Sequence, residues 1–172
     1  MRSMVTVVAI VCALCGIANV AAAQVIHNVV GMLHNGATVW EYNGSFSPAQ
    51  ATLNTSANRL KINAKVGDTV KFTVEGVSDL GVVFEHAAAE QNVLWTVTTT
   101  PNPLKLIDGN FVGFDPIRAR TTGPVLPGQT TIITIKLTQV TGANGILFGG
   151  DPDSEAGAAD KKPMLGVIVV TN

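Results

Sequence analysis

The feature that most constrains the fold of this chain is a repeated alternation of apolar and polar side chains. Residues 60–65 read LKINAK, and the same period of two runs through residues 70–75 and 133–138. Side chains two apart point to the same face of a β-strand, so each segment has one apolar face and one polar face. This pattern is typical of antiparallel strands that cover a core on one side and meet water on the other.

Turn signals separate these segments. Asn-Gly pairs stand at 35–36, 43–44 and 144–145, and Asp-Gly stands at 108–109. Both dipeptides accept the positive φ that tight hairpin turns require. No segment has a convincing helical period. The chain is therefore predicted to be all-β, a single sandwich of about seven to nine strands.

Residues 1–23 have the pattern of a secretory signal peptide. Arg2 supplies a positive start, residues 4–20 carry no charge, and three consecutive alanines provide small side chains for a cut before Gln24. The alternative, a membrane anchor, suits so short an apolar run poorly, because a span must cross about 30 Å of hydrocarbon. We therefore predict an exported protein, periplasmic or extracellular, whose single domain is residues 24–172 and has no membrane span.

Composition narrows the classes of function. Cys12 and Cys15 are the two cysteines of the chain, and both lie in the predicted signal peptide. The exported domain would then have no disulfide, no thiolate metal ligand and no cysteine nucleophile. The 11 basic residues are scattered among 12 acidic ones, with a net charge of −1 and no basic run. This charge pattern predicts that the protein has no nucleic-acid partner.

Several segments, taken in order, resemble the cupredoxins, the family of small blue copper proteins. The first strand is VIHNVVGMLHNG at 25–36, and a strand pair around a Gly-Asp turn is INAKVGDTVKFTVEG at 62–76. A Pro-Gly turn before a long strand is VLPGQTTIITIKL at 125–137. A glycine-led strand, GANGILFGGD, then precedes a methionine and the final strand, KPMLGVIVV, between 142 and 170. The resemblance implies a cupredoxin-like antiparallel β-sandwich with Greek-key connections.

The resemblance also implies that this chain lacks the type 1 copper site of the family. Cupredoxins hold that copper with two imidazoles, one thiolate and a weak axial methionine. Met164 matches the axial methionine, whereas Leu80 takes the position of the first histidine, and residues 151–163 contain neither cysteine nor histidine. One ligand of four, and the weakest, does not hold copper.

A non-standard copper site has its own candidate ligands. Met32 and His34 are two apart, so they would share a face of a strand. Together with His86 and Met164 they offer the thioether and imidazole groups that copper accepts. His27 stands at an odd offset from His34 and is predicted to face away from it.

An acidic segment is a candidate calcium site. Asp151, Asp153 and Glu155 stand at alternate positions and carry the carboxylate oxygens that calcium prefers. The alternative is a solvated loop whose charge is balanced by Lys161 and Lys162.

The sequence carries no nucleophile elbow, zinc-protease motif or phosphate loop. Asn43 and Asn54 each begin an N-glycosylation sequon. We therefore predict a non-enzymatic binding or structural module, most simply without a cofactor, whose partner is a protein or a small molecule. The alternative is a periplasmic copper-binding or electron-transfer protein that uses the Met/His site described above.

Overall fold

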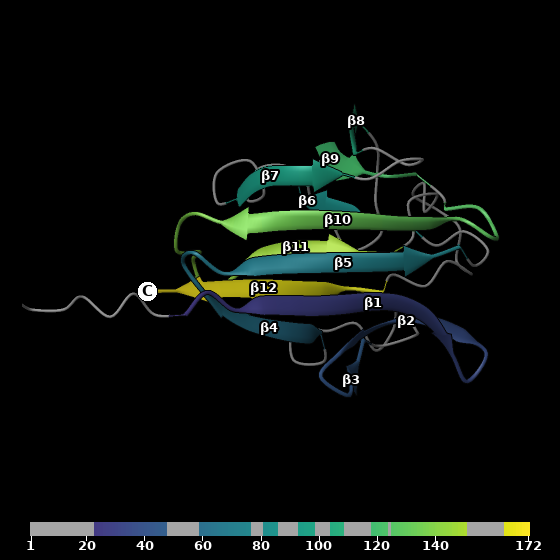
Figure 1. The fold of residues 1–172 in the computed structure, drawn as a ribbon, viewed down its shortest axis with the longest axis horizontal. Helices are drawn as coiled ribbons and strands as arrows, with labels where there is room; N and C mark the ends of the chain where they lie inside the picture. The colour runs from purple at the N-terminus through teal and green to yellow at the C-terminus, as the bar shows by residue number, and fades with distance from the viewer. Residues whose placement is uncertain are drawn as a thin grey trace, which may run out of the picture.

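Two six-stranded β-sheets pack face to face and form the sandwich (Figure 1). The computed structural model describes residues 23–47, 59–76, 81–85, 93–98, 104–108, 118–123, 125–150 and 164–172. Across these residues no helix is long and apolar enough to cross a membrane. The predicted boundary between a signal peptide and a domain is not tested, because residues 1–22 lie outside this set.

The first sheet has the strand order β3-β2-β1-β5-β10-β7. Its strands are β1 (Ile26–His34), β2 (Ala37–Tyr42), β3 (Ser45–Phe46), β5 (Thr69–Glu75), β7 (Val93–Thr98) and β10 (Thr130–Leu137). The second sheet has the order β4-β12-β11-β6-β9-β8. Its strands are β4 (Leu60–Lys65), β6 (Val83–Glu85), β8 (Lys105–Asp108), β9 (Arg118–Thr121), β11 (Ile146–Gly149) and β12 (Gly166–Thr171).

The predicted all-β sandwich is confirmed, with two differences in detail. The described residues hold twelve strands, more than expected, because β3, β6, β8, β9 and β11 have two to four residues and are too short to show a period of two. Each sheet also contains one parallel pair, β1 with β5 and β4 with β12, so the sheets are mixed rather than purely antiparallel. A parallel pair needs a long crossover, and three strands lie between β1 and β5 in the chain.

The alternation in the sequence places the core as predicted. In β4, the apolar side chains of Leu60, Ile62 and Ala64 are buried, while the polar ones between them are exposed. The strands β5 and β10 follow the same rule. In β12, five of the six residues are buried or half-buried, as expected for the apolar run Gly166–Val170.

Four aromatic side chains join the two sheets at the centre of this core. Trp40 and Phe72 come from the first sheet, and Phe84 and Phe148 come from the second. The ring of Phe72 lies 5.1 Å from that of Phe84, 4.9 Å from that of Phe148 and 5.6 Å from that of Trp40, each at a steep angle. Edge-to-face pairs of this kind add attraction to the burial of apolar area. Phe72 is therefore the side chain on which the contact between the sheets is centred.

Replacing Phe72 with alanine should lower the free energy of unfolding by about 3–5 kcal/mol, because three aromatic partners lose their contact and a cavity remains. Urea denaturation of parent and variant measures the difference. Val140→Ala is the control, since Val140 is 47% exposed and its truncation should change stability by about 0.5 kcal/mol or less. Equal losses in the two variants would contradict the central place of Phe72.

Candidate functional site

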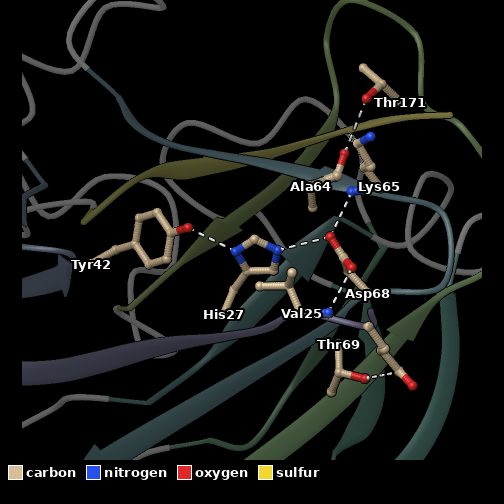
Figure 2. A network of polar contacts seen from close by, with 9 residues as sticks. Val25, His27, Tyr42, Ala64, Lys65, Asp68, Thr69 and Thr171 are labelled. Atoms are coloured by element: carbon tan, nitrogen blue, oxygen red, sulfur yellow. Dashed lines mark hydrogen bonds and ion pairs between the residues drawn. The ribbon is translucent and has the colours of Figure 1, made fainter. Parts of the chain in front are cut away.

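A chain of three polar side chains lies at the end of the sandwich where the C-terminus emerges (Figure 2). The hydroxyl of Tyr42 lies 2.7 Å from Nδ1 of His27, and Nε2 of His27 lies 3.1 Å from Oδ2 of Asp68. His27 is 7% exposed and Asp68 is 6% exposed. The three residues come from β1, from the end of β2 and from the turn between β4 and β5.

The local sequence explains how Asp68 reaches this position. Gly67 adopts a φ of +96°, which lets residues 66–68 fold into a tight turn between β4 and β5. The carboxylate of Asp68 then turns back and accepts the N–H of Lys65 at 2.8 Å. Its other oxygen accepts the N–H of Val25, just before β1, at 3.0 Å. One carboxylate thus holds the turn and the start of the first strand together.

These contacts also define the protonation of the network. A carboxylate only accepts, so Nε2–H of His27 donates to Asp68, and in the neutral ring Nδ1 accepts from the hydroxyl of Tyr42. Burial alone would raise the pKa of the Asp68 carboxyl. The N–H groups of Lys65 and Val25 and the side chain of His27 outweigh it, so that this pKa lies below its ordinary value. Asp68 is therefore a carboxylate at neutral pH, and its charge is compensated by three N–H donors.

The order hydroxyl, imidazole, carboxylate also occurs where a base activates a nucleophile. Here Tyr42 packs against the hydrophobic core cluster, and it is not among the residues that line the adjacent pocket. The geometry fits a structural role. Tyr42, His27 and Asp68 form a clamp that joins β1, β2 and the β4–β5 turn.

A pocket of about 610 Å³ opens beside this clamp. His27 and Asp68 contribute to its wall, and Lys65, Asn63 and Lys136 are among its other lining residues. Lys65 ends β4 of one sheet and Lys136 belongs to β10 of the other. Within the described residues, neither lysine ammonium group makes a hydrogen bond or an ion pair. The pocket is therefore lined by two exposed lysine side chains and by a carboxylate that is already satisfied.

Of the candidate copper ligands, Met32 and His34 share a face of β1 as predicted, and Met164 lies apart from them in the core. Val29 and His27 are buried on the inner face of β1, so the strand period places Met32 and His34 on the opposite face. Met164 is 1% exposed and belongs to the core cluster between the sheets. His27 does face away from His34, as predicted.

His34 has neighbours of its own. Its ring stacks on Phe46 with centroids 4.1 Å apart, and its Nε2 lies 3.0 Å from Nδ2 of Asn35. In the described part of the chain, no group of three or more histidine, cysteine, aspartate or glutamate side chains could hold a metal ion. The remaining candidates lie outside the described residues and stay predictions: His86, Asp151, Asp153, Glu155 and, at the expected ligand position, Leu80.

Sequence reasoning did not single out the clamp. The sequence places Asp68 in the Gly-Asp turn before β5 and assigns no role to Tyr42. One signal was available: His27 shares the inner face of β1 with Val29, and a histidine on a buried face needs hydrogen-bond partners. Such a partner is expected among polar residues at the same end of the sheet.

Comparisons with known proteins find solved structures that resemble this fold only distantly. No family model and no curated protein sequence matches the chain. Rusticyanin from Thiobacillus ferrooxidans is 15% identical over 86% of this chain and 77% of its own, with a TM-score of 0.43. A blue copper oxidase from Nitrosomonas europaea is 15% identical over 86% of this chain and 44% of its own, with a TM-score of 0.41. A cysteine protease inhibitor from Entamoeba histolytica is 11% identical over 87% of this chain and 98% of its own, with a TM-score of 0.37. The architecture described above rests on the strand pairing of this chain itself.

Asp68→Asn should lower the free energy of unfolding by about 1–3 kcal/mol at neutral pH, because an amide cannot accept all three N–H groups. The pKa of the Asp68 carboxyl in the folded parent lies below its ordinary value of 3.8. The carboxylate therefore stabilises the fold fully at pH values above 3.8, and this stabilisation is lost as the pH falls through the lower pKa of the folded state. The gap between parent and variant should therefore narrow in acid. Urea unfolding at about pH 7 and about pH 3 tests this.

Glu75→Gln is the matched control, because Glu75 is exposed at the end of β5. Its effect on stability should be small at both pH values. A gap for Asp68→Asn that is equally large in acid would show that the carboxylate charge is not what stabilises the clamp.

Proposed function

We propose that this chain is an exported, non-enzymatic β-sandwich that binds a small anionic ligand and has no type 1 copper site. The observation that carries the proposal is the pocket lined by Lys65 and Lys136, whose ammonium groups have no partner in the described part of the chain. A ligand carboxylate can accept charge-assisted hydrogen bonds from both.

The charge balance of the pocket supports an anion rather than a cation. Asp68 is the acidic side chain in the pocket wall, and its two oxygens already accept from Val25, Lys65 and His27. It has little capacity left for a cation or for the lysine side chains. Asn63 adds a neutral hydrogen-bond donor to the same wall.

The proposal of a non-enzymatic role is supported by the surroundings of Tyr42. Its hydroxyl is the group that His27 could activate, and Tyr42 packs against the core cluster and does not line the pocket. The absence of type 1 copper is supported by the sequence, since no cysteine follows Cys15, and that copper depends on a thiolate. Export is proposed from the sequence pattern of residues 1–23.

Lys65→Met and Lys136→Met should each weaken the binding of citrate, used here as a probe with several carboxylates, by about tenfold or more, equivalent to about 1.4 kcal/mol. Isothermal titration calorimetry on residues 24–172 measures the affinity. Each variant keeps an unbranched apolar side chain and removes the ammonium group. Glycerol, which is polar but uncharged, should not bind.

Lys61→Met is the matched control. Lys61 is exposed on the same face of β4 as Lys65, but it does not line the pocket. Citrate affinity should stay at the parent value in this variant. No citrate binding by the parent, or equal weakening by Lys61→Met, would overturn the anion site.

Loading residues 24–172 with Cu(II) should give no intense visible charge-transfer band, because no thiolate is present to produce one. Metal analysis after dialysis should find less copper than protein. Met164→Leu, a swap that conserves volume in the core, should not change either result.

The alternative copper function makes the opposite prediction. Stoichiometric copper that survives dialysis and is lost when Met32 and His34 are both changed to alanine would favour it. An intense thiolate-type band would contradict the absence of a type 1 site.

A further inference from the structure

The pocket beside the clamp has apolar side chains in its wall as well as charged ones. Val25 and Val66 both line it, and they are 49% and 41% exposed. Ala64, which is buried, lies in the same wall. Each valine therefore presents apolar surface to whatever occupies the pocket, and an apolar part of a ligand can displace water from it.

Hydrogen bonds of the main chain fix both valines. The N–H of Val25 donates to Oδ1 of Asp68 at 3.0 Å (Figure 2), and the carbonyl of Val25 accepts the N–H of Thr69 at 3.0 Å. The N–H of Val66 donates to the carbonyl of Thr171 at 2.9 Å. The apolar wall is thus formed before a ligand binds, which spares the ligand the cost of ordering these segments.

A lysine lies next to each valine. Lys65 precedes Val66 in the chain and is exposed at the end of β4. Lys136 is exposed on β10 and is paired with Thr69, whose N–H holds the carbonyl of Val25. The wall therefore has a lysine and a valine close together at two places. The flexible stem of a lysine lets its ammonium group follow a ligand carboxylate while the valines stay in place.

The size of the pocket suits a small organic molecule. Its volume of about 610 Å³ lies within the range of about 300–1,000 Å³ that is typical of such sites. These sites are mostly apolar, and a few polar groups fix the orientation of the ligand. Lys65, Lys136 and Asn63 are polar groups of that kind in this pocket.

We propose that the ligand of this pocket is an amphipathic monocarboxylate, whose carboxylate meets the two lysines and whose apolar body packs against the two valines. The proposal rests on the anion site proposed above and adds the apolar half of the ligand. A fully hydrated anion would leave Val25 and Val66 in water. A carboxylate with an alkyl tail removes them from water and keeps its contact with the lysines, so it uses both parts of the wall.

Isothermal titration calorimetry of the protein with acetate, butyrate, hexanoate and octanoate tests the apolar half. Complete burial of one CH₂ group raises affinity by about fourfold. We expect octanoate to bind more tightly than butyrate by about tenfold or more, since burial in an open pocket is partial. The neutral molecule 1-octanol, which is of similar length, should bind about tenfold more weakly than octanoate.

Val25→Thr and Val66→Thr separate the apolar wall from the charge. Each variant replaces a methyl group with a hydroxyl and keeps the branched shape of the side chain. Each should weaken octanoate binding by about threefold or more and leave citrate binding unchanged. Val140→Thr is the matched control, because Val140 is 47% exposed but does not line the pocket. Its octanoate affinity should equal that of the parent.

Three outcomes would overturn the proposal. Octanoate that binds no more tightly than butyrate, while citrate binding still depends on Lys65 and Lys136, would contradict the apolar half alone and leave the anion site standing. No binding of any carboxylate would remove the anion site and this proposal together. Sedimentation of the protein with phosphatidylglycerol vesicles that is lost in Val66→Thr would identify a membrane-binding surface in place of a small-molecule pocket.

Discussion

The hydrogen bonds of one three-residue turn, residues 66–68, hold the two sheets in register at one end of the sandwich. Within this turn, Val66 donates to the carbonyl of Thr171 in β12, and Gly67 donates to the carbonyl of Leu137 in β10. The carbonyl of Asp68 accepts from Leu137, and its carboxylate accepts from Val25 and from Lys65. Strands of both sheets therefore meet at this turn. One end of each parallel pair also lies there: Ile26 of β1 beside Thr69 of β5, and Lys65 of β4 beside Thr171 of β12.

The pocket lies at the same end as this turn. It is therefore separate from the region around Met164, where the resemblance to cupredoxins would place a metal. The strand β12 begins two residues after Met164 and ends at Thr171 in the pocket wall, and the seven residue steps from Met164 to Thr171 span at most about 23 Å at about 3.3 Å per residue. A ligand at the pocket would contact side chains of the clamp, which link β1, β2 and the β4–β5 turn. A metal near Met164 would contact a different end of the fold. The two proposed functions thus concern separate surfaces and can be tested independently.

The fold could be predicted from the sequence where the period of two is long enough to be seen. The strands β4, β5 and β10 have six to eight residues, and their buried positions are those that the alternation predicts. The parallel pairing of β1 with β5 could not be predicted, because alternation assigns faces and not partners. The site was missed for a related reason: Asp68 meets Val25 across 43 positions and His27 across 41. Local sequence identifies Gly67-Asp68 as a turn, but only the folded chain shows what its carboxylate binds.

The packing around Met164 follows from the residues that begin the next strand. Two positions later, a Cβ at Gly166 would collide with the ring of Phe148, which lies opposite it in the neighbouring strand. Glycine is therefore required for β12 to begin directly beneath the aromatic cluster. The start of the strand is held there, and the thioether of Met164 is held with it, 1% exposed. Burial of this thioether contributes about 1.5–3 kcal/mol relative to an exposed side chain. Met164 therefore contributes to the stability of the sandwich through its packing.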